Sequence, residues 1–344
     1  MTKLLNDPRI DPRIKAVFGE LDASPGPNLS SREEVLAMMN SPQAQEGMAA
    51  LEALFSSTVS EEAAPSAGIV FETKTFVSEP DGNTIQLQVI RPEGAGVLAC
   101  VYYVHGGGMA FGSAYDDNYR AWGRIIAAQG VAVAMVDFRN CILPSSAPEV
   151  APFPAGLNDC VSGLKWVRAH AAELKIDPDR IVVAGESGGG NLALATALKL
   201  NRDGEIGLIR GVYALCPFIA GQWPNPEYPS SIENEGVFMS LGHNRMTLGY
   251  GIEAFEQKNP LAWPIFATKE DLAGLPLTVI SVNECDPLRD EGISFYRKLI
   301  AAGVPARCRV VVGATHAVEI FPRCAPDISA NTANDIAYLA RTGR

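Results

Sequence analysis

Residues 181–195 read IVVAGESGGGNLALA, and this stretch decides the fold of the chain. Its first four residues are apolar, as in a strand that is covered on both faces of a parallel sheet. From Asn191 onward, alanine and leucine favour a helix. The Gly-x-Ser-x-Gly turn between them is typical of a nucleophile elbow, which is so tight that Gly185 and Gly189 must lack side chains. The stretch therefore makes Ser187 a candidate nucleophile at a helix N-terminus, where free N–H groups stabilise an anion.

A glycine-rich turn between a strand and a helix has two other uses, a plain connection and a phosphate cradle. A phosphate loop ends in Gly-Lys-Ser or Gly-Lys-Thr, and a dinucleotide fingerprint reads Gly-x-Gly-x-x-Gly. Neither pattern is present here. The turn therefore favours acyl transfer, and the remainder of the chain has to supply the partners of the serine.

A second glycine run reads HGGG at 105–108, directly after an expected strand. Consecutive glycines cost chain entropy, and they make sense where backbone N–H groups approach a ligand oxygen. Loops of this type supply the oxyanion-hole donors of esterases. We expect the amides of Gly107, Gly108 and Gly188 to be the donors. His105 is expected to support the loop rather than act as a base, and a merely flexible turn is the alternative.

The candidate base is one of four histidines in the sequence. His316 follows the expected strand 306–312, at the carboxyl edge of the sheet, where such folds present functional groups. His170 lies in a helical run and reads as an ordinary packed or solvated residue. His243 reads as a surface residue, with a substrate contact left open. We therefore predict that His316 is the base.

The acid is expected between the serine and the histidine in chain order. Asp286 lies just beyond the expected strand 277–282, where its carboxylate can accept the Nδ1–H of the base and stabilise the imidazolium. Glu284 and Asp290 are rivals, although Asp290 suits a helix cap or a salt bridge better. Asp286 is the predicted acid.

Strand patterns alternate with helical ones along the body of the chain. The expected strands are 69–77, 84–91, 98–104, 131–136, 181–184, 209–215, 277–282 and 306–312. Helical segments such as 120–129, 157–174 and 292–302 lie between them. This alternation predicts an α/β fold with an open, mainly parallel, doubly wound sheet.

The chain is expected to divide into an arm and a catalytic body. Residues 1–67 carry short helical patterns and read as an N-terminal helical arm, and 68–344 form the body. Within the body, about 217–267 are rich in aromatic residues and too long for a simple connection. We expect this insert and the arm to form a cap over the sheet edge, the alternative being a surface loop packed on the body.

Composition excludes several classes of protein. The formal net charge of −11 over 344 residues argues against nucleic acid or an anionic membrane as a partner. Seven scattered cysteines without a Cys-x-x-Cys pair predict reduced thiols and no metal site. Because neither a signal peptide nor a membrane span is evident, we expect a cytoplasmic protein.

Three ordered motifs carry a resemblance to a known family. HGGG at 105–108, GESGGGNLA at 185–193 and DPLRDEG at 286–292 resemble the signatures of the hormone-sensitive lipase family of α/β-hydrolases, the bacterial family IV carboxylesterases. The resemblance implies an eight-stranded α/β-hydrolase sheet, a helical cap and hydrolysis of short- to medium-chain esters without a cofactor. It assigns Ser187, Asp286 and His316 to the triad and the same three glycines to the oxyanion hole. Because relatives often dimerise, it also implies a homodimer.

Two departures from the family pattern bear on the pocket. Glu186 and Gly188 stand where the family commonly has Asp or Thr and Ala. Because the donor after the serine is a backbone group, catalysis is expected to survive. The stretch 138–144 also differs from the usual Tyr-Arg-Leu-Ala-Pro-Glu, which affects substrate preference.

The function predicted from the sequence is that of a serine carboxylesterase acting on a small-molecule ester. An amidase, lactonase or deacetylase using the same triad is the first alternative. A non-catalytic ligand-binding protein of this fold is the second, and a complete triad argues against it.

Overall fold

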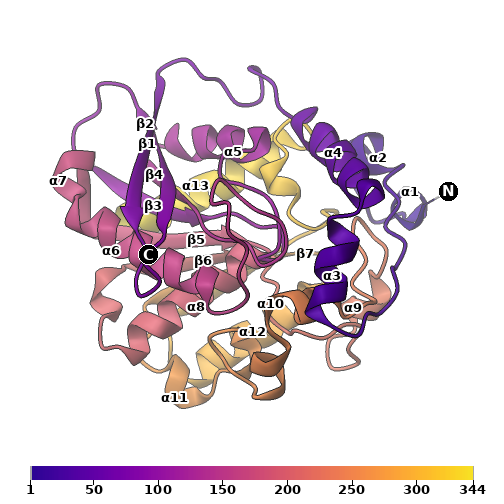
Figure 1. The fold of residues 1–344 in the computed structure, drawn as a ribbon. Coiled ribbons are helices and arrows are strands. Elements are labelled where there is room, and N and C mark those ends of the chain that lie inside the picture. Colours follow the sequence, from indigo (N-terminus) through magenta and orange to yellow (C-terminus); the bar gives the residue numbers. More distant parts are fainter. Residues whose placement is uncertain (1, 344) are drawn as a thin grey trace.

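The computed structural model describes residues 2–343, and its strands form one eight-stranded sheet in the order β1-β2-β4-β3-β5-β6-β7-β8 (Figure 1). The strands are β1 (Ile69–Val77), β2 (Thr84–Pro92), β3 (Leu98–Val104), β4 (Ala132–Asp137), β5 (Ile176–Glu186), β6 (Gly211–Leu215), β7 (Leu277–Asn283) and β8 (Ala306–Val311). β2 pairs antiparallel with β1 and β4, and the pairs from β4 to β8 are parallel. The predicted mainly parallel α/β-hydrolase sheet is confirmed.

The central strand β5 is longer than its apolar run. Its early residue Ile176 pairs with Leu98, and the register then shifts before Ile181 pairs with Cys100. Because polar residues separate the two parts, the periodicity of the sequence revealed only the buried part near 181–184.

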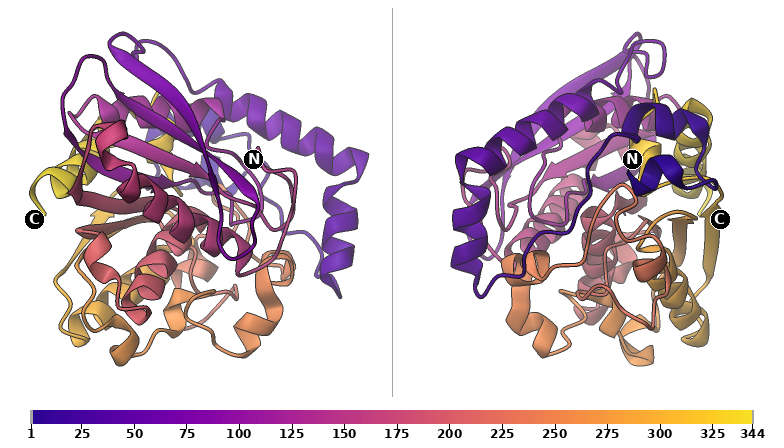
Figure 2. Two further views of the ribbon diagram at one scale, coloured as in Figure 1. Left: turned by 60° about the vertical axis from the view of Figure 1, so that its left-hand side comes forward. Right: turned by 90° about the vertical axis from the view of Figure 1, so that its right-hand side faces the viewer.

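Helices lie on both sides of the sheet (Figure 2). The helices are α1 (Lys3–Asn6), α2 (Pro12–Phe18), α3 (Arg32–Met39), α4 (Pro42–Ser56), α5 (Asp117–Ala127), α6 (Ala155–Ala169), α7 (Ala171–Leu174), α8 (Gly188–Arg202), α9 (Ser230–Glu233), α10 (Arg245–Glu256), α11 (Lys269–Leu272), α12 (Arg289–Ala301) and α13 (Pro326–Thr342). α5 and α13 pack on one face of the sheet, and α6, α8 and α12 on the other. The sheet is therefore doubly wound, as the alternating pattern predicted.

The strands bury side chains on both faces. In β3, Tyr102 and Val104 belong to the core beneath α6 and α8, whereas Val101 and Tyr103 belong to the core beneath α5 and α13. Since successive side chains point to opposite faces, a strand covered by helices on both sides must be apolar throughout. This explains the continuous apolar runs in the sequence.

The N-terminal segment connects the body with the insert that follows β6. α3 begins at the cap Ser31, whose hydroxyl accepts the N–H of Glu34 at 3.3 Å. α3 contacts α10 of the insert, and α4 contacts α5 of the body. Figure 1 shows α3 and α4 together at one end of the sheet, between these two parts.

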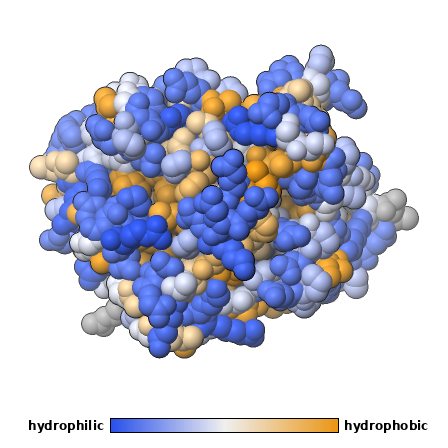
Figure 3. All heavy atoms as spheres, turned by 60° about the horizontal axis from the view of Figure 1, so that its bottom comes forward, coloured by the Kyte–Doolittle hydropathy of each residue, from blue (hydrophilic) through white to orange (hydrophobic). Residues whose placement is uncertain are grey.

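Figure 3 shows a face on which hydrophilic residues predominate and apolar residues lie in separate patches between them. Within residues 2–343, no helix is long and apolar enough to cross a membrane.

Candidate active site

Ser187 lies between β5 and α8 in a conformation that few side-chain-bearing residues adopt. Its φ is 55° and its ψ is −119°, so the backbone is strained as expected for a nucleophile elbow. The Ser187 N–H donates to the carbonyl of Leu215 at 2.9 Å, and the Ser187 carbonyl accepts from Phe218 at 3.0 Å. Bonds to the neighbouring strand β6 and its loop therefore hold the turn.

The glycines around the serine are required by space. A Cβ on Gly185 would lie 2.4 Å from the carbonyl oxygen of Gly189, and a Cβ on Gly189 would lie 2.0 Å from that of Val104. Both distances are far below van der Waals contact. The need for glycine that the elbow motif indicates therefore arises from the close approach of β3, β5 and α8.

Asp286 and His316 form a buried hydrogen-bonded pair. The Nδ1 atom of His316 lies 2.8 Å from Oδ2 of Asp286, and the other carboxylate oxygen accepts the N–H of Leu288 at 2.8 Å. Burial lowers the pKa of His316, but the Asp286 carboxylate outweighs burial, and the net pKa is raised. The pair therefore stabilises a proton on the ring.

The rival residues have other partners. The Glu284 carboxylate accepts the N–H of Gly313 at 2.8 Å, and Asp290 pairs with Arg289 at 2.9 Å. His170 stacks on Trp166 with ring centroids 4.0 Å apart. Among the acid and base candidates, which all lie within residues 2–343, only Asp286 and His316 are hydrogen-bonded to each other.

His243 lies in the insert and lines the same cavity as Ser187. Burial, followed by the charge of Arg245, lowers its pKa to about 4. The ring is therefore neutral at physiological pH, and a substrate contact stays a prediction.

Two of the predicted oxyanion donors lie on a loop with positive φ. Gly107 has φ of 87° and Gly108 of 62°, a region that glycine adopts at no steric cost. Among residues 2–343, neither amide donates a hydrogen bond. Gly188 is the first residue of α8, and the N–H of such a residue has no partner inside the helix. A Cβ on Gly188 would lie 2.7 Å from the nitrogen of Gly108, so the two motifs are in close contact.

His105 is buried beneath this loop. Its ring stacks on Phe138 with centroids 4.3 Å apart, and Nε2 lies 3.6 Å from a carboxylate oxygen of Asp137. The same carboxylate accepts the N–H of Ala114 at 2.7 Å. Burial lowers the pKa of His105. Its Nδ1 atom lies 3.0 Å from the carbonyl oxygen of Gly106, and the ring is not among the side chains that line the cavity, so support of the loop stays a prediction.

Glu186 connects the elbow with the glycine loop. One carboxylate oxygen accepts the N–H of Gly106 and the hydroxyl of Tyr119, both at 2.6 Å, and the other accepts the hydroxyl of Tyr103 at 2.5 Å. Burial raises the pKa of this carboxyl to about 7, against the opposing effect of these hydrogen bonds. Sequence reasoning noted Glu186 as a departure but missed this role.

Other supporting residues also escaped sequence reasoning. Asn234, from the insert, donates to the backbone carbonyl of Asp286 at 3.0 Å. Glu291 accepts the N–H groups of Ile219 and Ala220 at 2.7 and 3.0 Å. Its place inside the DPLRDEG run was the only signal in the sequence that could have indicated it.

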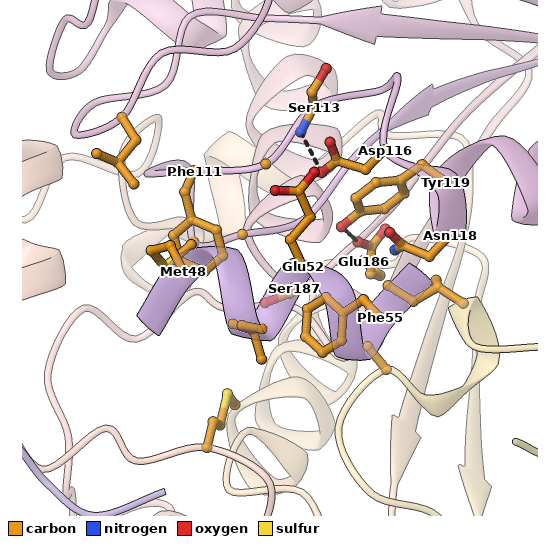
Figure 4. Close-up of a pocket in the computed structure, with 18 of the residues that line it drawn as sticks. Met48, Glu52, Phe55, Phe111, Ser113, Asp116, Asn118, Tyr119, Glu186 and Ser187 are labelled. Atoms are coloured by element: carbon orange, nitrogen blue, oxygen red, sulfur yellow. Dashed lines mark hydrogen bonds between the residues drawn. The ribbon is translucent and has the colours of Figure 1, made fainter. Parts of the chain in front are cut away.

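Ser187 and His316 line one cavity of about 690 Å³ together with Gly107 and Gly108. Its walls come from α4, the glycine loop, residues 143–146 and the insert. Figure 4 shows Met48, Glu52 and Phe55 of α4 at this cavity, close to Ser187. In the described chain the Ser187 hydroxyl makes no hydrogen bond to the ring, which is common in free hydrolases before substrate tightens the site.

Cys216 lies beside the pair, and its sulfur, Asp286 and His316 place ligand atoms within 4.8 Å of one another. Burial, followed by the charge of Asp286, raises the pKa of the thiol well above its usual value. Because metals bind the thiolate, this protonated thiol is a poor ligand. The pair fits a histidine base that is oriented and stabilised by a carboxylate better than it fits a metal ion.

Comparison with known proteins agrees with this geometry. A family model described as "alpha/beta hydrolase fold" matches residues 101–320. The solved structure of esterase Est22 is 56% identical, covers 99% of each chain and superposes with a TM-score of 0.98. Brefeldin A esterase, described as a bacterial homologue of human hormone-sensitive lipase, is 35% identical over 99% of this chain and 95% of its own, with a TM-score of 0.89. An arylesterase from Saccharolobus solfataricus is 30% identical over 266 residues, which are 76% of this chain and 81% of the relative.

The chain therefore belongs to the α/β-hydrolase fold family, in its hormone-sensitive lipase-like branch. It is a carboxylic ester hydrolase.

Proposed function

We propose that this hydrolase cleaves short- to medium-chain carboxylic esters in two steps, through an acyl-enzyme on Ser187. One observation supports the proposal. The strained elbow serine lines the same cavity as the His316 ring, and that ring is hydrogen-bonded to Asp286. Ser187, Asp286 and His316 follow one another along the chain as nucleophile, acid and base. This is the order of the catalytic triad in α/β-hydrolases. No metal or cofactor has a role in these steps.

In the first step His316 takes the proton of the Ser187 hydroxyl while the oxygen attacks the ester carbonyl. Asp286 keeps the ring in the required tautomer and stabilises its positive charge. The ring then gives the proton to the departing alcohol, and an acyl group stays on the serine. Water repeats the attack with the same proton transfers and releases the acid.

The amides of Gly107, Gly108 and Gly188 are proposed to bind the oxyanion of both tetrahedral intermediates. Each is a backbone donor without a partner near the elbow. Loss of one such donor costs about 3 kcal/mol of transition-state stabilisation in serine hydrolases. His105 supports the loop through its Nδ1 atom, which lies 3.0 Å from the carbonyl oxygen of Gly106.

We also propose that residues 1–67 and the insert at about 217–267 form a cap on the catalytic domain 68–344. Side chains from both segments line the cavity, and α3 contacts α10. Because most of these side chains are apolar, the cap would shield the acyl-enzyme from bulk water and accept an apolar chain.

The test is hydrolysis of p-nitrophenyl acetate, butyrate, octanoate and palmitate by the wild type and by Ser187→Ala. We expect turnover of the shorter esters and a loss of kcat on the order of a millionfold in the variant. Turnover by Ser187→Ala near the wild-type rate would refute the assignment of the nucleophile. The chain-length profile would report the size of the acyl pocket.

We further infer a homodimer and a cytoplasmic location. β8 is an edge strand with an exposed Val310, and the exposed Val312 directly follows it. Edge strands readily pair with a second copy. All seven cysteines are free, which fits a reducing compartment. Light scattering and cell fractionation test the two inferences, and a monomeric mass would refute the first.

A further inference from the structure

Two carboxylates interrupt the mainly apolar lining of the cavity. Glu52 of α4 and Asp116, the residue before α5, both line it. Figure 4 shows Glu52 extending from α4 toward Asp116 and Ser113. The arm and the body of the protein therefore each contribute a carboxylate to one part of the cavity.

No positive side chain neutralises this pair. Among residues 2–343, neither Glu52 nor Asp116 forms a salt bridge. Burial raises the pKa of Asp116 to about 6, and repulsion from Glu52, Asp137 and Asp117 adds to the rise. Like charges held together without a counterion destabilise the empty site, and a bound cation would relieve that repulsion.

A side-chain amide without a protein partner lines the same cavity. Asn118 is only 4% exposed and lines the cavity. Its side-chain amide makes no hydrogen bond to any residue that the structure describes. Because the amide faces the cavity without a protein partner, its oxygen can turn the negative end of its dipole toward a bound cation.

Aromatic rings complete the surroundings. Phe55, Phe111 and Tyr115 line the cavity beside these polar groups. The faces of such rings attract cations, and they favour alkylated ammonium groups in particular.

We propose that the preferred ester carries an ammonium group on one side of its scissile bond, which Glu52, Asp116 and Asn118 bind while Ser187 attacks the carbonyl. This inference rests on the proposed function and names the class of substrate for the same site. Either the alcohol or the acyl part can bring the cation, and the test separates the two.

The experiment uses pairs of esters with the same shape and different charge. Choline butyrate and 3,3-dimethylbutyl butyrate differ in the alcohol part by one positive charge. Ethyl 4-(trimethylammonio)butyrate and ethyl 5,5-dimethylhexanoate differ in the same way in the acyl part. For each pair, kcat/KM is measured on the wild type at pH 8, where Asp116 is ionised. Dissociation constants are measured on Ser187→Ala by calorimetry, which needs no turnover.

Two matched variants isolate the charge. Asp116→Asn removes it and keeps an oxygen that accepts the N–H of Ser113, a bond of 3.0 Å in the wild type. Asp117→Asn makes the same change one residue later, at an exposed position outside the cavity. Glu52→Gln removes the second negative charge, which the N-terminal arm contributes to the cavity.

We expect the wild type to prefer the cationic member of at least one pair, and that pair identifies the side that carries the charge. Asp116→Asn and Glu52→Gln should each lower the preference about fivefold, whereas Asp117→Asn should change it less than about twofold. The preference for the cationic ester should also weaken as the salt concentration rises, because dissolved ions screen the attraction between the carboxylates and the ammonium group.

Equal kcat/KM and equal affinity within both pairs would overturn the proposal, as would an equal effect of Asp116→Asn and Asp117→Asn. Failure of the proposed function looks different, since the wild type would then hydrolyse none of the four esters. Selective binding of a cationic ester to Ser187→Ala would still support the ammonium site in that case.

Discussion

Glu186 accepts the backbone N–H of Gly106 at 2.6 Å and thereby links the elbow directly to the loop that carries two of the proposed oxyanion donors. Gly106 precedes Gly107, and Glu186 precedes Ser187. A displacement of this bond therefore changes the distance between the attacking oxygen and the amides that stabilise its product. We predict that Glu186 is a positioning residue, because its carboxylate accepts hydrogen bonds from Gly106, Tyr103 and Tyr119 and acts on the reacting groups through them.

Glu186→Gln should lower kcat about tenfold and leave KM nearly unchanged. The amide has one acceptor oxygen where the carboxylate offers two, so it cannot keep all three of its hydrogen bonds in the same orientation. A loss confined to kcat is expected because the oxyanion exists only in the transition state and intermediate. Steady-state kinetics on p-nitrophenyl butyrate measure the effect.

Glu61→Gln is the matched control for that variant. Glu61 also accepts a backbone N–H, that of Ser66 at 2.8 Å, but it lies outside the cavity. We expect wild-type kinetics from the control. A rise in KM at constant kcat in Glu186→Gln would contradict the positioning role.

Gly188→Ala should reduce kcat between about tenfold and a hundredfold, although alanine is common at this position in the family. In this chain a Cβ there would lie 2.5 Å from the nitrogen of Met109, so the glycine loop would have to move away from the elbow. Displaced donors lose part of the stabilisation that a well-placed donor provides.

Gly207→Ala offers a comparison for the glycine change, since a Cβ at Gly207 meets nothing within 4 Å. It should leave kcat unchanged, and a crystal structure of Gly188→Ala would show the loop displacement. Wild-type kcat in Gly188→Ala would show that the loop adapts without cost.

The parts of this molecule that could be predicted from the sequence are those that depend on neighbours along the chain. The strands and the glycine turns follow from periodicity and from local steric limits. Ser187, Asp286 and His316 were proposed together because each follows an apolar strand, and parallel strands end at one edge of the sheet. The structure brings Asp286 and His316 into contact at 2.8 Å.

What could not be predicted depends on tertiary contacts between distant segments. Glu186 accepts hydrogen bonds from Tyr119, which lies 67 residues away in the chain, and from Tyr103, which lies 83 residues away. Glu52 similarly approaches Asp116 only because α4 packs against the body of the protein. No local sequence pattern indicates where α4 packs. A carboxylate in a motif indicates neither its partners nor its burial.

Asp286→Asn should lower kcat about ten thousandfold, because the amide cannot stabilise the protonated ring and favours the wrong tautomer. The remaining activity should also change its pH dependence. In the wild type the ring must be neutral to accept a proton, so activity rises with pH through a His316 pKa that Asp286 raises above 6.5 against burial. Without the carboxylate, the pKa falls and the midpoint of the acid limb moves to lower pH.

The pH profile of kcat/KM for Asp286→Asn, measured from pH 5 to 9, checks this shift. Asp290→Asn serves as its control, because Asp290 pairs with Arg289 instead, and its profile should match the wild type. A midpoint that moves to higher pH in Asp286→Asn would contradict the role of the carboxylate.

Stability should decrease as the pH rises toward 8, and Glu291 should account for part of the decrease. Burial raises the pKa of Glu291 from 4.5 to about 8. Between these values the folded protein keeps a proton that the unfolded chain releases, so the free energy of unfolding falls by up to about 1.4 kcal/mol per pH unit for this group.

Glu291→Gln removes the titration, and the amide oxygen of the glutamine can still accept from the N–H groups of Ile219 and Ala220. Chemical denaturation at pH 5.5 and 7.5 should therefore show a smaller pH effect in the variant than in the wild type. An equal loss of stability in both proteins would show that Glu291 does not titrate in this range.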